Sequence, residues 1–114
     1  CLGGLIKHLA YVERQWFQKV WAGREVEFPW SEEDPDAEFR LEEGDGAGGL
    51  IRFYREECDA SRQIVATSSL EDTVPSRRGD LSLRWILIHM IEETARHAGH
   101  ADLIREMLDG SVGD

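Results

Sequence analysis

The sequence predicts an all-α protein. Three long segments carry apolar residues at helical spacing, and no segment alternates apolar and polar residues as a strand does. Linkers with Pro, Gly and Asp separate these segments and favour turns. The chain has 114 residues, of which 41% are hydrophobic, so we expect residues 1–114 to form one domain around one core.

The first predicted helix runs from Leu2 to Trp21, and Gly23 is a plausible C-cap. The second runs from Gly48 to Ser68. The third runs from Ser82 to Leu108 and is followed by Gly110. The apolar stripe of the first helix recurs every three or four residues and consists of Leu5, Leu9, Val12, Trp16 and Val20. The second helix has one such face, made of Leu50, Phe53, Tyr54, Cys58, Ser61, Ile64 and Val65.

The linker between Gly23 and Ala47 is long enough to return along a whole helix, because an extended residue spans ~3.3 Å. We therefore expect the first two helices to run parallel, joined by a crossover. Phe28 or Trp30 should pack against the helices, since an exposed indole in this polar stretch would be unusual. The second linker, Leu70 to Leu81, is predicted to be a shorter loop.

The net charge is −10, from 13 Lys and Arg against 23 Asp and Glu. An acidic surface repels phosphate, which argues against nucleic acid or an anionic membrane as a partner. No apolar run is long enough to span a membrane, and no secretion signal is visible. Two cysteines, Cys1 and Cys58, make no disulfide framework, so we expect a reducing cytoplasm. The sequence enters a helix at once without an initiator Met, so we also expect a segment upstream.

Glu93 is a carboxylate on a stripe of the third helix that is otherwise apolar or histidine. At about 100° per residue, Glu93 shares a face with His97, and the adjacent Glu92 points away. Burying a carboxylate there costs several kcal/mol unless it is paired or binds a metal. The full stripe is Ile86, His89, Met90, Glu93, His97, His100, Ile104 and Leu108.

Glu93 and His97 are four residues apart, so their side chains can share one ligand. His8 is the only histidine outside this helix, and it lies beside the core-facing stripe of the first. Carboxylate and imidazole ligands suit zinc, nickel, iron or manganese, and three ligands with one open position are typical of a catalytic site. The alternatives are a Glu93–His97 salt bridge and a hydrogen-bonded core histidine at His8.

Two further histidines of the third helix are open to several interpretations. His100 is a candidate fourth ligand, proton acceptor or lining residue. His89 fits better as a packing or cap residue.

Three segments together resemble the DinB-like superfamily. The last helix of that fold is similar to residues 83–103, LRWILIHMIEETARHAGHADL, and its second helix to residues 5–17, LIKHLAYVERQWF. The loop of residues 28–37, FPWSEEDPDA, is similar to a branch of unknown function related to mycothiol-dependent maleylpyruvate isomerase. The resemblance implies an up-down-down-up four-helix bundle whose first helix has no counterpart here.

The resemblance also implies a divalent metal, with zinc favoured, held by His8, Glu93 and His97. It implies an enzyme that uses a low-molecular-weight thiol, such as mycothiol or bacillithiol, and an electrophile in a transferase or isomerase reaction. His100 stands where many relatives carry Gln and is the candidate for proton transfer. The alternatives are a bundle that binds a metal or small molecule without turnover and a purely structural bundle without metal.

Three helices of a four-helix design leave a groove where the missing helix would lie. We expect Leu5, Leu9, Val12 and Trp16 on one side of it and Ile88, Ile91, Ala95 and Ala98 on another. Such a patch needs a cover, either an upstream segment or a second copy of the chain, and we favour a homodimer.

Overall fold

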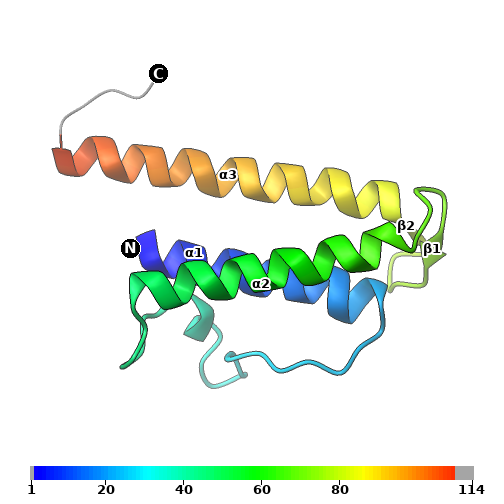
Figure 1. The fold of residues 1–114 in the computed structure, drawn as a ribbon, viewed down its shortest axis with the longest axis horizontal. Coiled ribbons are helices and arrows are strands. Elements are labelled where there is room, and N and C mark those ends of the chain that lie inside the picture. Colours follow the sequence, from blue (N-terminus) through cyan, green and yellow to red (C-terminus); the bar gives the residue numbers. More distant parts are fainter. Residues whose placement is uncertain (1, 110–114) are drawn as a thin grey trace.

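A computed structural model describes residues 2–109, which form three long helices (Figure 1). These are α1 (Leu2–Glu13) with its π-helical continuation η1 (Arg14–Trp21), α2 (Ala47–Ala66) and α3 (Leu83–Asp109). All three predicted helices are confirmed, and their ends agree to within about two residues. Gly23 has the predicted left-handed conformation after the first helix, with φ of 68°. The features predicted at Cys1 and Gly110 lie outside the described residues.

The direction of the helices follows the predicted crossover. Helices α1 and α2 run in the same direction, and α3 runs back along them (Figure 1). Residues 2–109 thus supply three long helices of a mostly helical fold, and the up-down-down-up order of four helices stays a prediction. None of the helices in this range has the length and apolar character needed to cross a membrane.

The first helix changes its hydrogen-bond pattern after Glu13, which the sequence did not predict. A regular α-helix would rotate Phe17 by about 140° from Val12, because each residue turns 100°. The π-helix joins residues five apart, as in the 3.0 Å bond from the Ala22 amide to the Phe17 carbonyl. Val12 and Phe17 are consequently both buried in the same core cluster.

The prediction of no sheet was wrong for the second linker. Thr73–Val74 (β1) pairs antiparallel with Leu81–Ser82 (β2), and Gly79 closes the turn with φ of 103°. Strands of two residues are too short to show alternation in a sequence. The hairpin leads directly into α3, where the Ser82 hydroxyl accepts a 3.1 Å hydrogen bond from the Trp85 amide.

The crossover between the helices packs onto α1 through aromatic side chains. The Tyr11 ring lies 6.2 Å from both Phe28 and Trp30, whose own rings are 4.3 Å apart. The prediction that one of these residues packs against the helices is confirmed. The crossover also contains one turn of 3-10 helix, η2 (Ala37–Phe39), in which Ala37 is buried.

The predicted groove exists, but one of its walls was assigned wrongly. Leu5 and Val12 are buried, because the α1 stripe packs on the other two helices. The groove instead lies between α2 and α3, with a volume of about 990 Å³. On α3 it exposes Ile91, Ala95 and Ala98 as expected, but not Ile88, which was also predicted to line it. The opposite wall is made mainly by Tyr54, Cys58, Ser61 and Val65 of α2.

The buried carboxylate of Glu57 on α2 joins the first two helices. It was not identified from the sequence. Glu57 is 6% exposed and accepts hydrogen bonds from Arg14 and Gln18 of η1. Two donors on the charged form offset the cost of burying this carboxylate.

Candidate metal centre

Two histidines from opposite ends of the sequence meet between α1 and α3. His8 lies on α1 and His97 on α3, and their Nε2 atoms are 3.0 Å apart. Only 12% and 15% of these side chains are exposed. The rings meet edge to face, with centroids 4.6 Å apart, so one nitrogen of each ring points at the other.

Glu93 completes this cluster from one turn earlier on α3. Its Oε2 atom lies 3.7 Å from Nε2 of His97, and its Oε1 atom accepts a 3.2 Å hydrogen bond from Arg96. One ligand atom each from His8, Glu93 and His97 all lie within 4.8 Å of one another. Glu92 is exposed, as the helical wheel predicts. The three residues singled out from the sequence therefore converge.

The surroundings keep His97 in its neutral form at neutral pH. Burial lowers the pKa of His97, and the nearby His8 lowers it further, against an opposing effect of Glu93. A neutral imidazole offers a lone pair to a cation, whereas a protonated one does not. The same shift weakens the salt-bridge alternative, because a neutral His97 3.7 Å from Glu93 is a poor ionic partner.

The donor set fits a divalent cation. Two imidazole nitrogens and one carboxylate oxygen are the ligands of many catalytic zinc sites, with a further position open. The Nε2 atoms of both histidines face each other at this point, and their Nδ1 atoms are buried without a hydrogen bond. Arg96 pairs with Oε1 of Glu93, while Oε2 lies on the side of His97 and can serve as the carboxylate ligand.

Two residues of the crossover, which the sequence reading did not single out, border the site. Glu38 places Oε2 3.1 Å from Nδ1 of His8, and Phe39 stacks on the His8 ring with centroids 4.2 Å apart. Both belong to η2, which contacts α1. No spacing in the sequence relates residues 38 and 39 to His8, because the path of the crossover decides where they lie.

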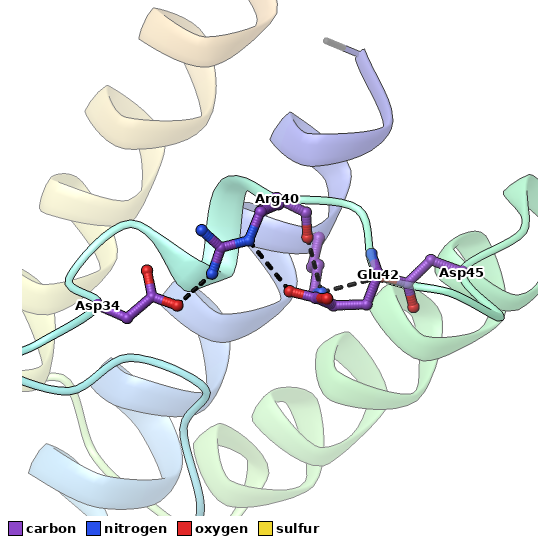
Figure 2. A network of polar contacts seen from close by, with 5 residues as sticks. Asp34, Arg40, Glu42 and Asp45 are labelled. Carbon is purple, nitrogen blue, oxygen red and sulfur yellow. Dashed lines mark hydrogen bonds and ion pairs between the residues drawn. The ribbon is translucent and has the colours of Figure 1, made fainter.

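The network that fixes this part of the crossover is charged (Figure 2). Arg40 pairs with Asp34 and Glu42, and its carbonyl accepts a 2.8 Å hydrogen bond from Nζ of Lys7. The Glu42 amide and Lys7 both donate to Asp45, which lowers the pKa of that carboxyl.

The other two histidines of α3 differ in their surroundings. His100 is exposed, and it lies close enough to His97 to contribute a small lowering of its pKa. His89 packs between aromatic rings, with centroids 4.7 Å from Trp16 and 5.0 Å from Trp85. The interpretation of His89 as a packing residue is thus confirmed.

Comparison with known proteins identifies the family of the chain. The sequence profile of the mycothiol-S-transferase family matches residues 1–110. The chain belongs to the mycothiol-S-transferase family. This family is a member of the DinB-like superfamily, so the resemblance seen in the sequence is confirmed. No curated protein and no solved structure matches the chain.

The name of the family indicates a transferase that acts at the sulfur of mycothiol, a small thiol. The His8, Glu93 and His97 cluster provides the only group of three or more potential metal ligands found among residues 2–109.

Proposed function

We propose that this chain is a metal-dependent S-transferase that joins mycothiol to a carbon electrophile. One observation carries the proposal: a mycothiol-S-transferase family member brings His8, Glu93 and His97 to one point, with ligand atoms within 4.8 Å. This cluster is partly buried, so a thiol could approach it from the open side. A reducing cytoplasm suits a reaction that starts from a free thiol.

His8, Glu93 and His97 would hold the metal, for which zinc is the first choice. When bound, the cation acts as a Lewis acid and lowers the pKa of the approaching thiol, so that a thiolate is available at neutral pH. Glu93 contributes the one negative charge among the three ligands. Its second oxygen is held by Arg96, which fixes the carboxylate in the orientation that faces His97.

His100 is the proposed proton acceptor. The S–H bond of the thiol breaks, the proton passes to the His100 ring, and the sulfur electron pair forms the new bond to carbon. The leaving group of the electrophile departs with the electron pair of the bond that breaks. An exposed histidine suits this role, because it can pass the proton that it accepts directly to water.

A second copy of the chain would complete the helical packing. We propose that residues 1–114 form one domain that pairs as a homodimer over the groove between α2 and α3. The exposed apolar side chain of Ile91, which lines this groove, supports this proposal, since Ile91 is 68% exposed. In a dimer, helices of the second copy would take the place of the helix that the superfamily order requires.

The proposal is tested on protein purified without a histidine tag. Bound metal is measured by mass spectrometry, and formation of the mycothiol conjugate of an alkyl halide is followed as purified, after chelation and after adding zinc back. We expect stoichiometric metal and a rate above the uncatalysed reaction that chelation removes and zinc restores. Metal without turnover would indicate a binding module, and absence of metal binding would indicate a structural bundle.

A further inference from the structure

We propose that Glu38 is a positioning residue that holds His8 in the tautomer and orientation needed for metal binding. The inference rests on the proposed function, in which His8 is a metal ligand. It concerns a residue of the crossover that does not itself contribute to the cluster of potential ligands.

The argument begins with the two nitrogens of the His8 ring. Its Nε2 atom faces His97, so binding a cation there requires a lone pair on Nε2 and the proton on Nδ1. A buried Nδ1–H group is costly without an acceptor. Nδ1 of His8 is buried and has no hydrogen bond, and the Glu38 carboxylate lies 3.1 Å from it. A small rotation of either side chain turns this contact into a hydrogen bond.

A carboxylate in this place has a recognised effect on metal-binding histidines. It accepts the ring N–H, fixes the tautomer and makes the opposite nitrogen a better ligand. The Glu38 side chain is only 16% exposed, so water screens this interaction less than it would at the surface. Phe39, the next residue, stacks on the His8 ring with an interplanar angle of 18° and restricts the plane in which the ring can lie.

The crossover is anchored next to His8, which makes Glu38 a fixed partner. Lys7 precedes His8 on α1, and its buried ammonium donates both to the Arg40 carbonyl and to Asp45. Glu38 and Phe39 therefore lie two residues or fewer from a point that is tied to the neighbour of His8. The Asp34 and Glu42 carboxylates hold Arg40 from both sides (Figure 2).

The two histidines have different surroundings at Nδ1. Nδ1 of His97 is also buried without a hydrogen bond, and no carboxylate pairs with that atom among the described residues. In the metal-free protein, the 3.0 Å contact between the Nε2 atoms needs one proton between them. If His8 carries its proton on Nδ1, the proton between the two Nε2 atoms belongs to His97. Nδ1 of His97 then carries a lone pair, which is less costly to bury than an N–H group. Glu38 thus assigns the tautomers of both rings.

The experiment compares Glu38→Ala and Glu38→Gln with Glu43→Gln. Glu43 is an exposed carboxylate of the same crossover and provides the matched control for charge. The dissociation constant for Zn²⁺ is measured by competition with a chelator. The tautomers of His8 and His97 in the metal-free protein are read from long-range ¹H–¹⁵N NMR spectra. Circular dichroism establishes that each variant is folded. If the Ala variant does not fold, the isosteric Gln variant provides the test.

We expect Glu38→Ala to weaken zinc binding about 10–100-fold, the usual cost of losing such a carboxylate. Glu38→Gln should lose less, because its amide oxygen still accepts a hydrogen bond, and Glu43→Gln should match the wild type. The spectra should show the proton of His8 on Nδ1 in the wild type and a mixture of tautomers in Glu38→Ala.

Folded Glu38 variants with wild-type zinc affinity and wild-type tautomers would overturn the inference while leaving the proposed function intact. A wild-type protein that binds no zinc would instead contradict the proposed function. The tautomer of His8 in the metal-free protein would then still decide whether Glu38 positions the ring.

Discussion

The Nε2 atoms of His8 and His97 lie 3.0 Å apart although 89 positions separate the two residues in the sequence. Each side chain alone is an ordinary interior histidine, and only the antiparallel packing of α3 on α1 brings the two together. This contact, with Glu93 one turn away from His97, makes a site out of three residues that no local motif connects.

The first prediction concerns the ligands themselves. His97→Ala removes one of three protein ligands, so zinc affinity should fall by more than the ~10–100-fold that the loss of an outer partner costs. Metal content after gel filtration and a chelator competition would measure the loss. Glu92→Ala is the control, because Glu92 is adjacent to Glu93 but exposed. Full metal content at unchanged affinity in His97→Ala would show that the site lies elsewhere.

The sequence was sufficient for the helices and for the residues of the candidate site. Helical periodicity located α1, α2 and α3, and the same wheel that separates Glu93 from Glu92 identified the stripe that faces α1. His8 could be selected because no other histidine lies outside α3. These properties are local, or follow from counting residues of one type.

Several features that depend on packing between distant segments were not predicted. Glu38 lies near His8 only because η2 folds against α1, and nothing in the order of residues 28–45 specifies that contact. The π-helix depends on which residues α2 and α3 present to Phe17. One wall of the groove was predicted wrongly, because an apolar stripe in the sequence does not determine which neighbouring helix covers it. In the structure the α1 stripe is covered, and the adjacent face of α2 lines the groove.

The second prediction is a pH dependence. Burial, with the Glu13 carboxylate beside it, raises the pKa of the Cys58 thiol from 9.0 to about 11. The folded state therefore retains the thiol proton longer than the unfolded state does. The stability that Cys58 contributes is complete below about pH 9 and should be lost as the pH rises towards about 11. Unfolding measured between these pH values should show a loss that is smaller in Cys58→Ala.

The same shift makes Cys58 unreactive at neutral pH. Relative to a free thiol, its thiolate population is about 100-fold lower, so alkylation should be slower by about that factor. Iodoacetamide labelling at pH 8 in a Cys1→Ser background, before and after unfolding in urea, measures the ratio. Equal rates in the two states would contradict the buried environment of the thiol.

The third prediction concerns the ionic contact between the first helix and α2. Glu57→Ala leaves Arg14, whose side chain is 20% exposed, without its carboxylate partner. Because Arg14 also donates to the Glu27 carbonyl, the cost should be about 2 kcal/mol of unfolding free energy, less than for a fully buried pair. Urea unfolding measures it. Glu56→Ala, at the adjacent exposed position, should change stability by no more than ~0.5 kcal/mol.

The fourth prediction concerns the anchoring of the crossover. Trp30→Ala removes an aromatic contact to Tyr11 and Phe28, so the segment from Val26 to Asp45 should become several-fold more sensitive to proteolysis. Limited digestion with mapping of the cleavage sites tests this. Glu32→Ala, an exposed change in the same segment, should leave the pattern unchanged. Rapid cleavage throughout the segment in the wild type would mean that the aromatic contacts do not hold it.

The last prediction is that the chain pairs over the groove between α2 and α3. This groove carries exposed Ile91 and has a volume of about 990 Å³, so much apolar surface meets water in a single copy. At ~25 cal/mol per Å², covering the apolar lining of this groove is worth about 4 kcal/mol in each copy, a substantial part of the stability of a domain. A symmetric contact with a second copy is the commonest way to gain it.

Sedimentation should therefore give about twice the chain mass of 13.0 kDa at micromolar concentration. Ile91→Glu places a charge in the groove and should shift the protein to a folded monomer, because an unpaired buried charge opposes association. Ile51→Glu changes an exposed isoleucine of α2 that does not line the groove, and should leave the dimer intact. A wild-type chain that stays monomeric, folded and stable on dilution would contradict this prediction. It would show that the three helices tolerate the open groove without a second copy of the chain.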